Sequence, residues 1–385
     1  MSEKKQNSGG FKFYEYVLYW LVTAVVLILA IPVLLFKFAG FLINSMRAPF
    51  KSIRNLVGFL LIILILAAGI TAYEIFVPYD IGKATQSVMF EEGDSFAGLM
   101  NDLEKNGILR GRYLFRLIAI NRGIDKIVIP GRYDFSGRIS MYYILRKLAE
   151  HDIATLLLTI PEGLSIFKVA GLFSRNMGID SVAFVTRATD TSFSRAKYGV
   201  NGLPGYLFPD TYRFFYGIKI DGIFDVLVGE FNRRTAGLFD SLPPGLFSRE
   251  QVLTLASIIE AEAVKNDEMP LISSVYHNRL QRKMLLQADP TVLYAMGGAY
   301  KPLRYIDLKF DSPFNTYLHK GLPPAPINSP GIEAIRAAIH PEKTDYLYFV
   351  ADGKGRHIFS RTLNEHNHAK YKVKREKMER ENNQL

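Results

Sequence analysis

The sequence has 385 residues, a formal charge of +10 and no cysteine. Its length allows roughly two or three domains at the usual ~100–200 residues each. Hydrophobic residues make up 49% of the chain and charged residues 22%, which excludes a disordered polyelectrolyte. Without cysteine, disulfides, thiolate zinc sites and cysteine nucleophiles are excluded as well. The excess of basic over acidic residues favours an acidic partner, namely nucleic acid, anionic lipid or an anionic polymer.

Two uncharged runs near the N-terminus are long enough to cross a membrane. Residues 16–36 form a run of 21 and residues 56–73 a run of 18, close to the ~20 that a hydrocarbon core of ~30 Å requires. Both are longer than the apolar core of a signal peptide. We predict an N-terminal tail at 1–15 and a transmembrane anchor region at 16–77, with spans at about 16–36 and 56–77. Two buried helices of a soluble core are the alternative. No such run follows residue 80, which excludes a multi-span transporter.

The charges around the second run predict its direction. Three basic residues between 47 and 54 precede it, and the acidic Glu74 and Asp80 follow it. By the positive-inside tendency, the body after residue 78 then lies outside the cytoplasmic membrane. Three lysines before residue 13 favour an N-terminus on the inner side of the membrane. Two full spans with the body outside would instead place the N-terminus outside. Either that signal is overridden, or the first run enters and returns, bending at Pro32 and Gly40.

The first part of the body reads as a small α+β unit. SVMF predicts a strand, and the helix after it is expected to begin at residue 94 or 95 and end at 106–107. A second helix is predicted at 112–121. KIVIPGRYDF predicts a strand interrupted at Pro130, and Ser140 is expected to cap a third helix that runs to residue 148. This unit, 78–155, holds no nucleophile or metal cluster, so we expect it to bind or to act as a spacer.

The larger part of the body contains the strongest helix. LLLTIPEG predicts a strand and a turn, after which Ser165 caps a helix, and a loop is expected at 201–205. Ser248 and Gln251 then have the spacing of a capping box at the start of a helix over 247–263. From residue 369 the chain is highly charged, which predicts a solvated helix or a disordered tail at 369–385.

Two glutamates of this helix are candidate acids. With ~100° per residue and Val252 at zero, Glu260 falls at about 80° and Glu262 at about 280°, on opposite sides of the apolar stripe. A carboxyl held against apolar packing has a raised pKa, which suits a general acid. Two ordinary boundary glutamates would show the same pattern, and the geometry does not choose between the two residues.

The segments after this helix are rich in amides, hydroxyls and aromatic rings, the groups that recognise sugars. Structural hydrogen bonding around the core is the alternative reading. The histidines lack the spacing of a metal site, and no nucleotide-binding loop or nucleophile elbow is present, so no metal or cofactor is expected. The candidate sugar contacts are Asn278, Gln287, Asp289, Thr291, Tyr294, Asn315 and Tyr317.

The motifs of the body resemble one family. ASIIEAEA at 256–263, followed by VYHNRLQRKMLLQADPTVLYAMG, is similar to the endolytic murein transglycosylases of the MltG/YceG-like family. The agreement includes PEGLS, LFPDTYRF, NTY, GLPPAPINSPG and YLYFVADGKGRHIFS, in the same order, and covers roughly residues 78–368. The resemblance implies an α+β fold with a LysM-like module at 78–155 and a YceG-like catalytic domain at 156–368.

The resemblance also implies a reaction. It makes Glu260 the catalytic acid and base and Glu262 a second acidic position of the motif. The implied activity is non-hydrolytic cleavage of the bond between N-acetylmuramic acid and N-acetylglucosamine in peptidoglycan, leaving 1,6-anhydro ends and ending strand elongation. The implied partners are glycan strands, the cytoplasmic membrane and peptidoglycan synthases. A nucleic-acid partner is not expected, because the basic residues form no clustered stripe.

Two departures from the family pattern bear on this prediction. Leu203-Pro204-Gly205 stands where the family has Leu-Glu-Gly, and Ala325 replaces a glycine in GLPPAPI. A second hydrophobic run near the N-terminus is also unusual for the family. A hydrolytic muramidase and a catalytically inactive peptidoglycan-binding scaffold are the alternatives, the latter because of Pro204.

Overall fold

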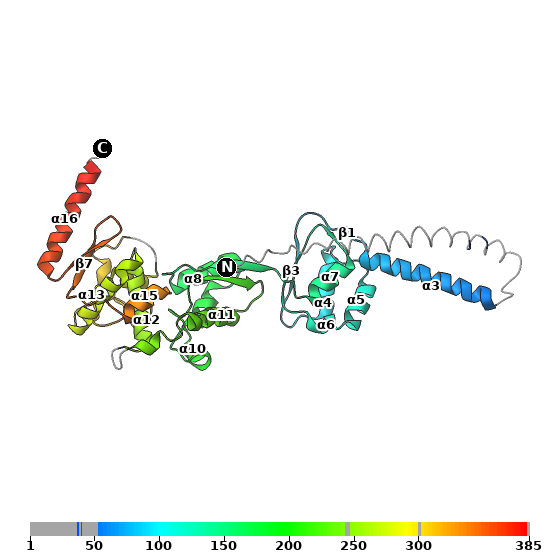
Figure 1. Ribbon diagram of the computed structural model, residues 1–385, viewed down its shortest axis with the longest axis horizontal. Helices are drawn as coiled ribbons and strands as arrows, with labels where there is room; N and C mark the ends of the chain where they lie inside the picture. The colour runs from blue at the N-terminus through cyan, green and yellow to red at the C-terminus, as the bar shows by residue number, and fades with distance from the viewer. Residues whose placement is uncertain (1–36, 38–39, 41–52, 243–246, 299–301, 383–385) are drawn as a thin grey trace. The chain divides into compact units, whose positions relative to one another are not determined.

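The computed structural model describes residues 37, 40, 53–242, 247–298 and 302–382 (Figure 1). The first predicted span, at 16–36, lies outside these residues. The chain divides into two compact units. One comprises 1–86, 100–128 and 135–150, and the other comprises 87–99, 129–134 and 151–385. Each unit mixes helices and strands, as the α+β prediction expected.

The first unit begins with the apolar helix α3 (Ile53–Phe76). Among the described residues it is the one helix long and apolar enough to cross a membrane, over Leu56–Phe76. No residue of its apolar window is buried, and Leu64 is 64% exposed. A helix of a soluble core would bury such side chains, so this exposure favours the predicted span at 56–77 over the soluble alternative.

The rest of the first unit is a small module of short helices and strands. Its strands β1 (Tyr79–Asp80) and β4 (Arg138–Ile139) pair antiparallel. Ser140 caps α7 as predicted, because its Oγ accepts a hydrogen bond from the Tyr143 N–H at 3.2 Å. The helices are α4 (Phe96–Lys105), whose first residues belong to the second unit, α5 (Arg112–Asn121), α6 (Ile124–Ile127) and α7 (Met141–Ala149).

The strand predicted over KIVIPGRYDF is only partly correct. The strand β3 covers Gly131–Phe135 and pairs with β2 (Gln86–Phe90), whereas Ile124–Ile127 forms the short helix α6. Gly123, with φ at 69°, starts that helix in the left-handed region that glycine tolerates. Pro130 has no N–H to donate to a ladder, so the strand begins after it.

A two-stranded sheet and a layer of helices form the first half of the second unit. β5 (Thr155–Thr159) pairs antiparallel with β6 (Thr211–Phe215), with Leu157 opposite Arg213. Phe173, Phe184 and Phe224 are fully buried between the helices and stack edge to face or in parallel. The helices are α8 (Ile166–Met177), α9 (Ser181–Thr189), α10 (Thr191–Tyr198), α11 (Ile220–Arg234) and the 3-10 turn Phe239–Ser241.

The second half of this unit is built around α12 (Arg249–Glu262), the helix predicted at 247–263. The predicted capping box is present: Ser248 and Gln251 exchange side-chain and backbone hydrogen bonds. Residues 252–259 are all buried, and α12 packs against α15. The other elements are α13 (Met269–Gln281), α14 (Asp289–Ala295), α15 (Ile332–Ile339), β7 (Tyr348–Ala351), β8 (His357–Ser360) and the 3-10 turns Asn266–Glu268 and Asp307–Lys309.

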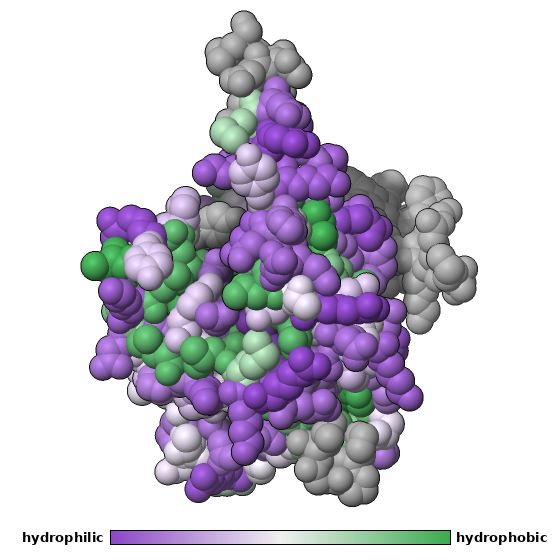
Figure 2. Space-filling model, turned by 90° about the vertical axis from the view of Figure 1, so that its left-hand side faces the viewer, coloured by the Kyte–Doolittle hydropathy of each residue, from purple (hydrophilic) through white to green (hydrophobic). Residues whose placement is uncertain are grey.

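The charged tail is a helix, one of the two predicted states. α16 (Leu363–Asn382) contacts the antiparallel hairpin of β7 and β8 at its start, where His366 stacks on Tyr348 at 5.2 Å. Figure 2 shows its outer part projecting as an almost wholly hydrophilic column, with hydrophobic side chains gathered on the face beneath it. Its charged residues therefore face solvent.

A loop and a proline segment, 120 residues apart in the sequence, meet in the second unit. Gly205 has a φ of +85°, and a Cβ placed on it would lie 2.7 Å from Cγ and 2.9 Å from Cβ of Pro326. Glycine is required here for both the left-handed backbone and the close approach. Pro204, the first departure from the family pattern, thus lies beside the segment that contains Ala325, the second departure.

We expect Gly205→Ala to lower the free energy of unfolding by roughly 2 kcal/mol, through backbone strain and overlap with Pro326. Urea denaturation measures this change. The control is Gly229→Ala on the exposed side of α11, where a Cβ meets nothing within 4 Å. This change should raise the free energy of unfolding by about 0.5–1 kcal/mol. Equal stabilities of the two variants would contradict the proposed close contact.

Candidate active site

Three segments that are distant in the sequence meet at the end of α12. The third is the end of α12 itself; the first two are the PEGLS segment, 161–165, and the INSPG segment, 327–331. They pair through Ser329, whose N–H donates to Leu164 O at 2.9 Å and whose carbonyl oxygen accepts from the Gly163 N–H at 2.9 Å. Ser257 of α12 holds the second segment, because its Oγ accepts from the Ile327 N–H at 3.0 Å. The Asn328 amide also donates to Ser257 O at 2.7 Å.

Glu260 lies where these segments meet. Its Oε2 accepts a hydrogen bond at 3.0 Å from the N–H of Gly331, the N-cap residue of α15. The preceding Ile258 and Ile259 are fully buried, whereas Glu260 is half-buried. Burial raises the pKa of Glu260, and the nearby Glu162 carboxyl raises it further, while the Gly331 N–H opposes both. The carboxyl is therefore protonated to a higher pH than an ordinary glutamate.

Glu162 is the second carboxyl of this site, and the sequence analysis did not identify it. It lies against Gly331, where any Cβ would overlap its carboxyl group. A Cβ on the adjoining Gly163 would lie 3.6 Å from Cγ of Glu260. The exposed Glu162 and the half-buried Glu260 thus share one face of the 327–331 segment. Glu162 lies in the predicted turn, and the pairing of the adjoining Gly163 and Leu164 with Ser329 brings it to the helix end.

Glu262 belongs to a different cluster. Its Oε1 accepts a hydrogen bond from the Tyr276 hydroxyl at 3.1 Å. Burial and the charge of Asp289 raise the pKa of Glu262 to about 7, against the lowering effects of Tyr276 and Arg279. Tyr317 extends the cluster, because its hydroxyl donates to Asp289 Oδ1 at 2.5 Å. Two predicted sugar contacts, Asp289 and Tyr317, therefore gather at Glu262.

Three other predicted sugar contacts have their polar groups engaged within the chain. The Asn278 amide donates to Thr344 O and Tyr346 O at 2.8 and 2.9 Å. Thr291 and Asn315 are fully buried. The Thr291 hydroxyl donates to Ala288 O at 2.7 Å, and the Asn315 amide donates to two backbone carbonyls. These contacts support the structural reading that the sequence left open, and sugar binding by these residues stays a prediction.

The remaining two candidates are placed differently. Tyr294 packs between Phe314, at 4.9 Å, and Phe167, at 5.8 Å between ring centroids. Phe167 is 44% exposed and follows the PEGLS segment, so this aromatic cluster adjoins that segment. Gln287 is exposed and has a φ of 51°, in the left-handed region that is strained for a residue with a side chain. Its N–H donates to Thr316 O at 3.1 Å.

Two polar atoms of the site are buried without a hydrogen-bond partner among the described residues. They are Ser165 Oγ and Asn328 Oδ1. Ser165 precedes α8 as predicted, but its side chain makes no capping hydrogen bond. An unpaired buried oxygen costs free energy, so both atoms are candidates for contact with a bound molecule. Within the described parts of the chain, no group of three or more His, Asp or Glu side chains could hold a metal.

The fold and this site define an α+β protein with a protonatable carboxyl at a junction of three motifs. The chain matches the model of the YceG-like family over residues 88–372. It therefore belongs to the YceG-like family, which confirms the family resemblance. A crystal structure of a yceG-like protein from Listeria monocytogenes has a TM-score of 0.52 and 32% identity, covering 74% of this chain and 98% of that one.

Two curated relatives carry the same name. The endolytic murein transglycosylase of Bacillus subtilis (strain 168) is 31% identical over 307 residues, which are 75% of this chain and 85% of the relative. The endolytic murein transglycosylase of Streptococcus pneumoniae serotype 2 (strain D39) is 29% identical over 304 residues. That match covers 70% of this chain but only 55% of the pneumococcal protein.

We expect Glu162→Gln to lower the pKa of Glu260, because it removes the carboxylate that disfavours ionisation of Glu260. Titration of glutamate side-chain carbons by ¹³C NMR measures the shift. Glu379→Gln, in an exposed glutamate of α16, is the control and should leave the pKa of Glu260 unchanged. An unchanged pKa in the Glu162 variant would contradict the proximity of the two carboxyls.

Proposed function

We propose that this protein is a peptidoglycan lytic transglycosylase. It cleaves the β-1,4 bond between N-acetylmuramic acid and N-acetylglucosamine inside glycan strands and leaves 1,6-anhydro ends. The observation that carries the proposal is the half-buried Glu260 carboxyl, with its raised pKa, beside the exposed Glu162. Membership of the YceG-like family and the names of the two relatives support the same substrate.

One carboxyl suffices for the reaction. Protonated Glu260 donates its proton to the glycosidic oxygen as the bond to the muramyl anomeric carbon breaks. The muramyl C6 hydroxyl attacks that carbon, and its proton passes to the Glu260 carboxylate, so the acid is restored. Burial of Glu260 favours the acid form before cleavage. The Gly331 N–H and the N-terminus of α15 stabilise the carboxylate form that must act as the base.

The placement of the protein follows from the same proposal. The span at Leu56–Phe76 anchors the chain in the cytoplasmic membrane, with the body on the outer side. There the 78–155 module, LysM-like by resemblance, binds glycan, and the 156–368 domain cleaves nascent strands and ends their elongation. Peptidoglycan synthases are the proposed partners, because they make the strands that this enzyme would cut.

A hydrolytic muramidase is the second candidate function, and Glu162 is the observation that favours it. Ordinary glycosidases use a second carboxylate to activate water or to act as the nucleophile. The carboxyl of Glu162 lies on the same face of the 327–331 segment as that of Glu260. In the lytic reaction Glu162 only tunes the pKa of Glu260.

Product masses separate these functions. We expect the full chain, incubated with uncrosslinked glycan strands, to give fragments with 1,6-anhydro ends, which are one water lighter than reducing ends. Reducing ends would show the muramidase reaction instead. Binding to the strands without shortening them would support the catalytically inactive scaffold, the alternative that Pro204 motivates.

We expect Glu260→Gln to lower turnover by roughly 10²–10⁴-fold, the usual contribution of positioned acid–base catalysis, and towards the upper end because one residue serves both steps. The glutamine oxygen can still accept from the Gly331 N–H, so fold and glycan binding should persist. Initial rates of strand shortening measure the loss, and a pull-down on glycan strands measures binding.

Glu262→Gln is the matched control, two residues along the same helix. Its amide oxygen can still accept from the Tyr276 hydroxyl, and we expect a smaller loss of turnover. An inactive Glu262→Gln beside a Glu260→Gln variant of normal activity would move the catalytic assignment to the second cluster and leave the reaction class intact.

A further inference from the structure

Helix α5 presents an uncovered apolar stripe. Tyr113 is 91% exposed, Leu117 67% and Ile120 50%. Spaced four and three residues apart, they share one side of the helix, within a sector of about 60°. The opposite side carries Phe115 and Ala119, which are fully buried in the module. The stripe is thus a second apolar face, beyond the one that the fold of the module requires.

Basic residues surround this stripe. Arg116 lies beside it on the same helix, Arg110 and Arg112 precede the helix or start it, and Arg122 and Lys126 follow it. Asp125 is the one acidic residue between positions 110 and 126. Arg112 is paired with Glu104 at 3.1 Å, whereas Arg116 and Arg122 are exposed. An apolar stripe with a basic border is the composition of a helix that lies in the interface of an anionic membrane.

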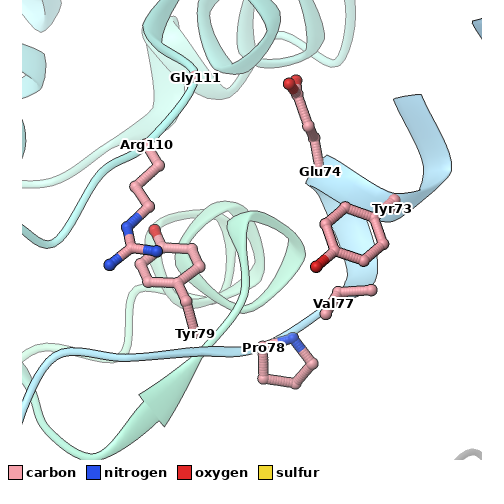
Figure 3. A pocket seen from close by; sticks show the side chains of 7 residues that line it. All are labelled: Tyr73, Glu74, Val77, Pro78, Tyr79, Arg110 and Gly111. Carbon is pink, nitrogen blue, oxygen red and sulfur yellow. The ribbon is translucent and has the colours of Figure 1, made fainter. Parts of the chain in front are cut away.

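The start of α5 lies at the end of the candidate span. A Cβ placed on Gly111, the residue before α5, would lie 3.6 Å from Oε2 of Glu74 in α3. A pocket of about 250 Å³ lies between the end of α3 and the start of α5 (Figure 3). Tyr73 and Glu74 line it from α3, and Arg110 and Gly111 line it from the residues just before α5. There Arg110 lies over the ring of Tyr79, at 4.3 Å. Glu74 precedes the last span residue, Phe76, by ~3 Å of helix, so α5 begins at the depth of the lipid headgroups.

We propose that α5 is a membrane-docking helix, whose Tyr113, Leu117 and Ile120 enter the outer face of an anionic lipid bilayer beside the span. Figure 1 shows α5 on the side of its module from which α3 leaves, which is the side a bilayer around α3 would occupy. The aromatic Tyr113 and the arginines suit the interface, where a ring and a cation can each keep a polar end in water. The inference rests on the proposed anchoring by α3 and adds a second attachment, which fixes the height and orientation of the small module above the membrane.

Depth-dependent quenching of tryptophan tests the inference. The chain has one tryptophan, so Trp20→Phe gives a silent background for Tyr113→Trp. The full chain is reconstituted in vesicles of phosphatidylglycerol and phosphatidylcholine with brominated acyl chains. We expect roughly twofold quenching of Tyr113→Trp, because interfacial helices bury their apolar face ~5–10 Å deep. Leu117→Asp added to this variant should abolish the quenching, and its exposed position leaves the module folded.

Two control positions separate this inference from the anchoring. Val182→Trp, 73% exposed on α9 of the second unit, should show no quenching. Leu64→Trp in α3 should be strongly quenched if α3 spans the bilayer. Quenching of Leu64→Trp without quenching of Tyr113→Trp would overturn the docking of α5 and leave the anchor intact. An unquenched Leu64→Trp would overturn the anchoring itself, and equal quenching of Tyr113→Trp in phosphatidylcholine alone would overturn the role of the arginines.

Discussion

The short antiparallel bridge between Leu164 and Ser329 is the constraint on which the candidate site depends. It joins the PEGLS and INSPG segments, which are separated by more than 150 residues. Because Ser257 holds the same 327–331 segment from the side of α12, the backbone of that segment is fixed on two sides. The Gly331 N–H is thereby aimed at Glu260, and the Glu162 carboxyl lies against the same glycine.

The opposing effects on the Glu260 carboxyl suit the two protonation states that the proposed reaction requires of it. Burial and the neighbouring Glu162 favour the protonated form, while the Gly331 N–H and the start of α15 favour the ionised form. A carboxyl buried without a donor would give up its proton poorly. One with several donors and no burial would be ionised at neutral pH and unable to act as an acid. The geometry therefore holds Glu260 between the two extremes.

The sequence predicted the local elements well because their signals are local. The capping box at Ser248, the Ser140 cap and the helix at 112–121 all follow from residues within one or two turns. KIVIPGRYDF predicts strand on both sides of Pro130, because apolar content alone does not reveal that Gly123 starts a helix. Glu162 was missed for a different reason: its place in the site depends on the pairing of Gly163 and Leu164 with Ser329, which leaves no periodic pattern in the sequence.

The two glutamates of α12 show why a raised pKa alone does not identify a catalytic acid. The pKa of Glu262 rises to about 7, although Glu262 is half-buried like Glu260, and its carboxyl already accepts from the buried Tyr276 hydroxyl. A general acid must reach the oxygen of a substrate, which requires an opening beside it. Glu260 is half-buried and its neighbour Glu162 is exposed, so this carboxyl pair borders solvent. The exposed Glu162 carboxyl beside Glu260 is therefore the physical argument that favours Glu260, and it is independent of the family motif.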